Sequence, residues 1–160
     1  MCTQRVDQMR SFHKLSVCGE DLHTEVMAAI YATGAKGQAA AIRAGEVWGR
    51  VRNAAKGLLP VDDKGLVPVR RNPDLWELKW KLGRLGQFRM YHAEPGGDPA
   101  MVGLVFHRKD VPGADADEIK RLQNGEMDRS GKRYGDWVNV LWGHQSKCCT
   151  HCVADIESGL

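Results

Sequence analysis

The segment Leu75-Trp76-Glu77-Leu78-Lys79-Trp80-Lys81-Leu82 decides the fold class, because apolar and charged side chains alternate along it. Successive side chains of a β-strand point to opposite faces, so the pattern predicts a strand with tryptophans in the core and a basic outer face. Gly83-Arg84-Leu85-Gly86 then provides a glycine-flanked turn. Together they predict the first half of a β-hairpin.

The returning strand of this hairpin is predicted from Gln87 to His92, where Phe88, Met90 and a buried His92 alternate with Gln87, Arg89 and Tyr91. If both strands bury their aromatic side, Lys79, Lys81, Arg89 and Tyr91 project from one solvent-exposed surface. Residues 64–92 carry 7 basic and 2 acidic side chains, whereas residues 93–160 carry 8 and 11. A positive sheet face suits a polyanion such as RNA. The alternative is a solvated face whose lysines protect a sheet edge.

A third strand is predicted from Met101 to Lys109, after a loop rich in glycine and proline. It is apolar on both faces as far as Phe106, which is typical of an interior strand. Strand alternation places His107 on the face opposite Leu104 and Phe106, and Lys109 joins His107 there.

Helical periodicity predicts one helix from Asp21 to Gly34 and a second from Gln38 to Leu58, both before the hairpin. Val61 to Pro73 is expected to be a connector. A last, polar helix is predicted to begin after Asp115, which can cap it, and to end raggedly because of its glycines. The prediction is an α+β domain, with two N-terminal helices packed on a small, mostly antiparallel sheet, over residues 20–135. Residues 1–19 form an extension or a short edge strand, and residues 136–160 form a C-terminal extension.

The 160 residues suit one domain, and no apolar run approaches the roughly 20 residues of a membrane helix. The polar N-terminus has no signal-peptide pattern, so we expect a cytoplasmic chain with reduced thiols and no membrane partner. The tail contains possible zinc ligands, but only one Cys-x-x-Cys pair, which favours a thiol-rich tail over a metal site. These side chains are His144, Cys148, Cys149, His151 and Cys152.

Four short motifs in this order resemble those of the RelE/HigB-like toxins, in the branch that includes phage-derived Gp49-like proteins. Leu75-Trp76-Glu77-Leu78-Lys79 resembles the family's Leu-Trp-Glu-Leu-Arg strand, and Arg89-Met90-Tyr91 resembles an element of its next strand. Val105-Phe106-His107-Arg108-Lys109 resembles the closing strand, and Glu118-Ile119 the start of the last helix. The resemblance covers about residues 20–135. It departs at Asp110, where the family has a hydroxyl residue after its basic pair.

The resemblance implies a toxin of a type II toxin–antitoxin system, an endoribonuclease that cuts messenger RNA, commonly on the ribosome. Its partner would be a cognate helix-turn-helix antitoxin. RNA cleavage by 2′-OH attack needs a base, an acid and cations around the phosphorane, and it needs no metal or other cofactor. The expected catalytic residues are His107, Arg89, Lys109 and Tyr91. The expected RNA-binding residues are Lys79, Lys81, Arg108, Arg133 and Tyr134.

Other readings of the same residues stay open. Arg89 could instead pair with Glu77 across the hairpin, and a histidine at a strand end is often only a solvated side chain. A non-catalytic module of the same fold, holding a nucleic acid or a protein, is the alternative function. A zinc-dependent interaction element in the tail is a third possibility.

Overall fold

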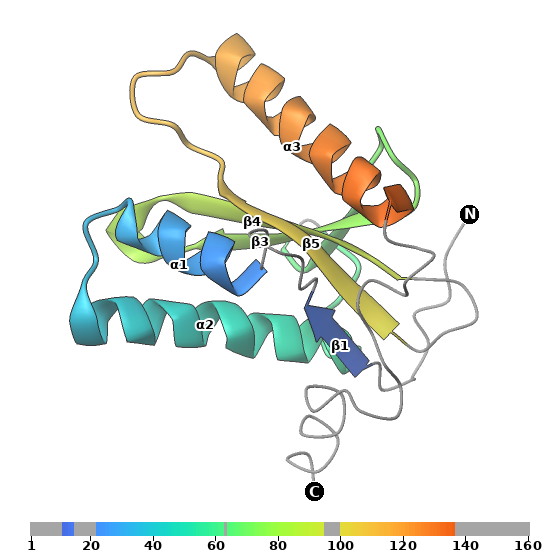
Figure 1. The fold of residues 1–160 in the computed structure, drawn as a ribbon, viewed down its shortest axis with the longest axis horizontal. Coiled ribbons are helices and arrows are strands. Elements are labelled where there is room, and N and C mark those ends of the chain that lie inside the picture. Colours follow the sequence, from blue (N-terminus) through green and yellow to red (C-terminus); the bar gives the residue numbers. More distant parts are fainter. Residues whose placement is uncertain (1–10, 15–21, 63, 95–99, 137–160) are drawn as a thin grey trace, which may run out of the picture.

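The structure, a computed structural model, describes residues 11–14, 22–62, 64–94 and 100–136. The described part is an α+β domain, as the sequence predicted (Figure 1). In chain order its elements are β1 (Ser11–Lys14), α1 (Leu22–Tyr31), α2 (Gly37–Ala55), β2 (Leu66–Pro68), β3 (Leu75–Lys81), a short 3₁₀ turn η1 (Gly83–Leu85), β4 (Gln87–Ala93), β5 (Ala100–Arg108) and α3 (Ala116–Asp136).

The predicted hairpin is confirmed and forms the middle of the sheet. The described strands are arranged in the order β1-β5-β4-β3-β2, and all neighbouring pairs are antiparallel except β1 with β5. Trp76 lies opposite His92 and Trp80 opposite Phe88. All four side chains are buried, which confirms the predicted core face and the buried histidine.

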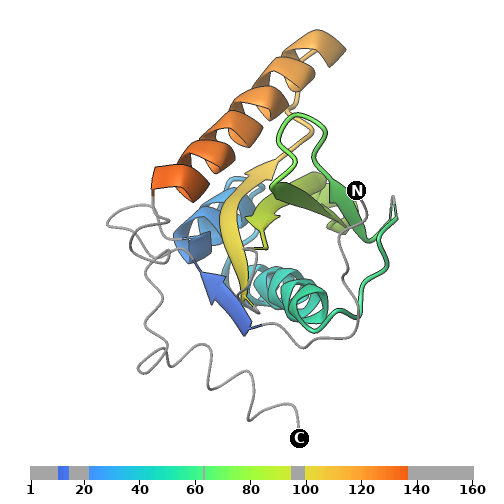
Figure 2. The same ribbon diagram turned by 90° about the vertical axis from the view of Figure 1, so that its right-hand side faces the viewer.

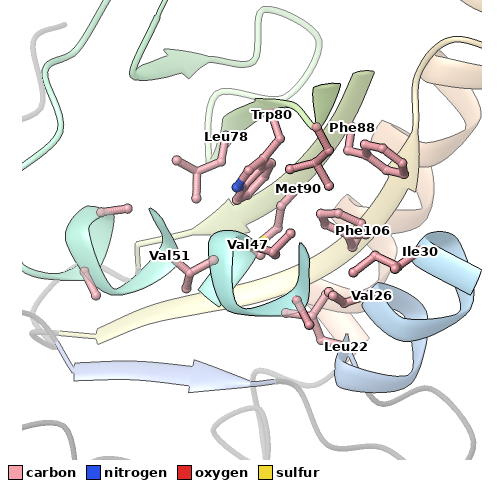
Figure 3. Packing of buried hydrophobic residues seen from close by; sticks show 14 of the residues in the cluster. Leu22, Val26, Ile30, Val47, Val51, Leu78, Trp80, Phe88, Met90 and Phe106 are labelled. Atoms are coloured by element: carbon pink, nitrogen blue, oxygen red, sulfur yellow. The ribbon is translucent and has the colours of Figure 1, made fainter. Parts of the chain in front are cut away.

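Helices α1 and α2 cover the tryptophan face of the sheet. Both helices end close to where the periodicity predicted, and their apolar residues point into one core with the strands (Figure 3). Phe106 stacks on Phe88, with ring centroids 5.6 Å apart, and meets Trp80 edge-on at the same distance. The cluster includes Leu22, Val26, Ile30, Val47, Val51, Leu78, Trp80, Phe88, Met90 and Phe106.

Helix α3 lies across the opposite face of the sheet (Figures 1 and 2). It begins where predicted, because Asp115 accepts a hydrogen bond from the Glu118 amide at 2.8 Å. The expected ragged end is wrong, since the helix continues through its glycines to Asp136. Met127 and Tyr134 pack on a second cluster that includes Leu75 and Tyr91. The N-terminal end of α3 stands away from the sheet in both views.

Two features of the sheet were not foreseen. Strand β2 lies within the segment that was expected to be a connector. Little of its outer edge can pair with another strand, because Pro68 has no amide hydrogen and the Leu66 amide already donates to the Pro60 carbonyl.

A register shift occurs between β4 and β5, where Tyr91 faces Val105 but the next residue faces Gly103. Because this bulge adds a residue to β5, Leu104 and Val105 both join the cluster under α3. Leu104 therefore lies on the same side as His107, which corrects the simple alternation.

Candidate active site

Three predicted site residues form a row across the sheet, on the face that α3 covers. Lys79 of β3 is the register partner of Arg89 of β4, and Arg89 is the partner of His107 of β5. The shared face was predicted correctly, but its exposure was not. Arg89 is only 6% exposed and Tyr91 is 0% exposed, because α3 lies over this part of the sheet. Periodicity assigns residues to a face without showing what packs against it.

The Arg89 guanidinium is engaged within the protein. Its Nε lies 2.9 Å from Oε1 of Glu77, as an ion pair without hydrogen-bond alignment. Its Nη1 donates to the Phe88 carbonyl at 2.8 Å, and its Nη2 donates to Oε1 of Gln87 at 3.3 Å. The alternative pairing with Glu77 is therefore confirmed. Arg89 can hold a phosphate only if it exchanges some of these partners.

Tyr91 and His107 form a stacked pair beside Arg89. Their ring centroids are 5.4 Å apart and the planes differ by 24°. Burial, reinforced by Glu77, raises the pKa of Tyr91, so its hydroxyl stays protonated. Gln123 approaches this hydroxyl and opposes the rise, although the two groups do not reach hydrogen-bond geometry. The pair thus supplies a protonated phenol at neutral pH.

His107 lies half-buried at the end of this row. Burial lowers its pKa, an effect that Glu126 opposes and Arg89 and Arg129 reinforce. The imidazole is therefore neutral near pH 7, the form that accepts a proton. Its Nδ1 lies 3.2 Å from the Arg108 carbonyl, whereas its Nε2 is buried and has no hydrogen-bond partner among the described residues. A buried ring nitrogen without a partner is uncommon and is often associated with function.

Two side chains of α3, Gln123 and Glu126, belong to the site although the sequence analysis did not predict them there. Gln123 of α3 donates from Nε2 to Oε2 of Glu77 at 3.4 Å. Glu126, one turn further along α3, pairs with Arg129 and acts electrostatically on His107. The sequence pattern did not place Gln123 or Glu126 over the strands, because both are polar, although Met127 and Tyr134 of the same helix pack on this face. The charged surroundings of Arg89 and His107 are therefore built partly by α3.

The rim of the row carries accessible cations. Lys81 is exposed, Lys109 is half-buried, and the Lys79 side chain is 28% exposed. Lys81 can contact a phosphate backbone directly, whereas Lys79 lies 3.9 Å from Oε1 of Glu77. These lysines are therefore the predicted residues that the fold leaves best placed for binding.

Arg108 does not join this group. It is the register partner of Phe88, which belongs to the opposite face of the sheet. Its Nε pairs with Oδ1 of Asp110 at 3.1 Å, and the same oxygen accepts the Gln87 amide hydrogen at 2.8 Å. Gly86 has a φ of 112°, and a Cβ there would lie 2.5 Å from Asp110. Asp110 thus closes the hairpin turn, which gives its carboxylate a structural role.

Arg133 is not on the rim either, because it is buried in a polar cluster at the edge of β5. Its Nη1 lies 2.7 Å from Oε1 of Glu25 and donates to the Leu104 carbonyl at 2.6 Å. The other Glu25 oxygen accepts the Phe106 amide hydrogen at 3.0 Å. This arrangement satisfies the strand edge beyond β1, so Arg133 has a structural role. Tyr134 is half-buried against the apolar cluster under α3 and is likewise part of the packing.

Metal ligation has no candidate within residues 11–14, 22–62, 64–94 and 100–136, where no group of three acidic, cysteine or histidine side chains is suitably gathered. The cysteines and histidines of the tail lie outside the described residues, as does the apolar stretch after Asp136. Across the same ranges, no helix has the length and apolar character to span a membrane.

Comparison with protein-family models, curated proteins and solved structures finds no match to this chain. The resemblance to RelE/HigB-like toxins thus depends on the short motifs quoted above.

Proposed function

We propose that this chain is the toxin of a type II toxin–antitoxin pair, a metal-independent endoribonuclease that cuts messenger RNA on the ribosome in the cytoplasm. The observation that carries the proposal is the row Lys79-Arg89-His107 across three neighbouring strands, with Tyr91 stacked on His107. Three of the four resemblance motifs contribute residues to this one place. A neutral imidazole, a protonated phenol and cations can supply the base, the acid and the charge stabilisation that cleavage by the 2′-OH needs.

The reaction divides among these residues by their protonation states. Neutral His107 takes the proton of the ribose 2′-OH, and the 2′ oxygen attacks the adjacent phosphorus. Lys79 and Lys109 stabilise the charge of the phosphorane. The bond from phosphorus to the 5′ oxygen then breaks, and Tyr91 supplies the proton that the leaving oxygen needs. The products are a 2′,3′-cyclic phosphate and a free 5′-OH. Because Arg89 and Tyr91 are buried, the first half of α3 moves from the sheet when RNA binds.

A non-catalytic binding module is the second candidate, and one observation favours it. All the polar nitrogens of Arg89 contact partners inside the protein, and Tyr91 is fully buried. In that case the exposed Lys81 and its neighbours would hold a nucleic acid that is never cut.

The test is induction of the chain in bacterial cells, followed by growth measurement and mapping of new 5′ ends in cellular messenger RNA. Growth arrest with new ends is expected for the wild-type chain. His107→Gln and Lys79→Ala are expected to lower cleavage by about 10²-fold or more, the usual contribution of a general base or a charge-stabilising group. Arg52→Ala removes an exposed cation from α2, on the other side of the sheet, and is expected to leave cleavage unchanged.

The outcome separates the two candidates. Full toxicity and unchanged RNA ends in His107→Gln would remove the assigned base and with it the proposed mechanism. RNA binding by the purified chain without any new ends would favour the binding module. Co-expression of an adjacent helix-turn-helix gene that restores growth would support the antitoxin partner.

A further inference from the structure

The carboxylate of Glu77 lies between the cations of the candidate site. Its Oε1 is 2.9 Å from Nε of Arg89 and 3.9 Å from Nζ of Lys79. Its Oε2 accepts the hydrogen bond from Gln123 of α3. The side chain is only 12% exposed, so the ion pair with Arg89 is shielded from water. One oxygen thus occupies the space that two cations share, and the other is held by the covering helix.

A phosphate oxygen would require the same surroundings. Phosphate and carboxylate both accept charge-assisted hydrogen bonds from guanidinium and ammonium groups, at similar distances. Glu77 also points from the sheet face that carries Lys79, Arg89 and His107, because it precedes Lys79 by two residues on β3. The carboxylate therefore lies where an RNA phosphate must enter to reach Arg89.

We infer that Glu77 is an internal substitute for phosphate, which occupies the anion site of Arg89 and Lys79 until a phosphoryl group replaces it. Gln123 holds the other carboxylate oxygen, Oε2, so the fit of α3 on the sheet sets how readily the exchange occurs. The identity of the entering group as RNA backbone rests on the proposed function. The anion site itself does not, because any phosphoryl anion can occupy it.

A competing role and a purely structural role of Glu77 predict opposite changes in anion binding when the carboxylate is neutralised. If Glu77 only supports Arg89, neutralising the carboxylate weakens every function of the site. If Glu77 competes with phosphate, neutralising it strengthens anion binding. At the 2.9 and 3.9 Å separations seen here, the attraction between the carboxylate and each cation is strong even at an effective dielectric constant of about 20. Screening and remaining exposure reduce this, so we expect a gain in affinity of about tenfold.

The experiment titrates the full chain with inorganic phosphate at constant ionic strength, and follows the side-chain Nε–H signal of Arg89 by NMR. Glu77→Gln keeps the shape of the side chain and removes its charge. It is expected to bind phosphate about tenfold more tightly than wild type, with a shift of the Arg89 signal. Glu46→Gln is the matched control, because Glu46 also pairs with an arginine, Arg43, at 2.8 Å, but on exposed α2. It is expected to bind within twofold of wild type.

A second variant keeps the test decisive if Glu77→Gln does not fold. Gln123→Leu leaves the charge of Glu77 in place and removes its hydrogen bond to α3, so a gain of about two- to threefold is expected. Unchanged or weaker phosphate binding in a folded Glu77→Gln chain would overturn the inference, as would an unchanged affinity in Gln123→Leu when the first variant is unfolded. Tighter phosphate binding at Arg89 without any RNA cleavage would support the anion site and contradict the proposed ribonuclease.

Discussion

The two faces of the sheet are built from the same strands but differ in composition. The face under α1 and α2 is mostly apolar, with His92 and Arg108 as exceptions, and its stacked Phe88 and Phe106 lie in the core. The face under α3 is apolar only in part. Leu75, Tyr91 and the residues around the bulge are packed there, whereas Glu77, Lys79 and Arg89 interact through charge beside the neutral imidazole of His107.

The contrast separates stability from function within one sheet. A buried charged group is costly unless it is paired, and the second face retains several such groups with partners that only partly satisfy them. His107 Nε2 has no partner in the described part of the chain, and the Tyr91 hydroxyl has none of good geometry. Because Trp80 Nε1 on the other face also has no hydrogen-bond partner among the described residues, the charged groups Glu77, Lys79 and Arg89 are what distinguish this face, and we interpret it as the functional face on that ground.

The largest expected loss of stability follows from a substitution on the apolar face. Phe88→Ala removes a fully buried ring and is expected to lower the free energy of unfolding by about 3–5 kcal/mol. Tyr91→Phe, on the other face, removes only a hydroxyl without a well-formed hydrogen bond and is expected to change it by less than about 1 kcal/mol. Urea unfolding followed by tryptophan fluorescence measures both. Equal losses in the two variants would remove the distinction between the faces.

The next largest loss of stability is expected where α3 contacts the edge of β5. Glu25→Ala leaves buried Arg133 without its carboxylate and frees the Phe106 amide, so we expect a loss of about 2–3 kcal/mol. Glu46→Ala breaks an exposed pair on α2 and is expected to cost under about 1 kcal/mol. Hydrogen exchange should show the loss first in α3. Equal losses of stability in Glu25→Ala and Glu46→Ala would show that the cluster of Glu25 and Arg133 does not hold α3 on the sheet.

A smaller effect depends on pH. Because burial lowers the pKa of His107, the unfolded chain binds more protons than the folded one between this lowered pKa and about 6.5. Stability from this group is complete above pH 6.5 and is lost as the pH falls towards the folded pKa. His107→Gln should therefore lose less stability than wild type between pH 7 and pH 5. Parallel pH profiles from thermal unfolding would contradict a buried, neutral imidazole.

The smallest effect distinguishes two glycines of α3. A Cβ at Gly125 would meet no atom within 4 Å, so Gly125→Ala is expected to stabilise the chain by about 0.5–1 kcal/mol through helix propensity. A Cβ at Gly131 would lie 2.6 Å from Nδ2 of Asn72, in the turn before β3. Gly131→Ala is therefore expected to gain less than Gly125→Ala, because Asn72 must move. Thermal unfolding of both variants measures the difference, and a larger gain at Gly131 would contradict the close packing of α3.

The sequence predicted the hairpin well, because tryptophans alternating with charged residues fit only a half-buried strand. Strand β2 was missed since three residues between prolines and glycines are too short to show a period. The length of α3 was missed because its glycines predicted an end, although contacts such as Arg133 with the Leu104 carbonyl hold the helix together. Tertiary contacts here outweigh local propensity.

Only part of the candidate site was predicted, because the local sequence pattern does not show tertiary contacts. Alternation placed Lys79, Arg89 and Tyr91 on one face, and the structure brings His107 to that row. The pattern could not show which part of α3 covers the face, because Gln123 and Glu126 contact it through polar groups while Met127 and Tyr134 pack on its apolar cluster. Arg133 was expected on the rim but is buried, because an arginine in a binding surface and an arginine paired at a strand edge look alike in sequence. Only the position of Glu25, in another helix, distinguishes them.

The most direct test of the central claim is the chemistry of the RNA ends. Purified full-length chain is incubated with ribosome-bound messenger RNA, and the 3′ ends of the fragments are analysed by mass spectrometry. Attack by the 2′-OH, with His107 as base, predicts 2′,3′-cyclic phosphate ends from the wild-type chain and about 10²-fold fewer from His107→Gln. Intact messenger RNA with the wild-type chain, or equal amounts of these ends from both chains, would contradict the account.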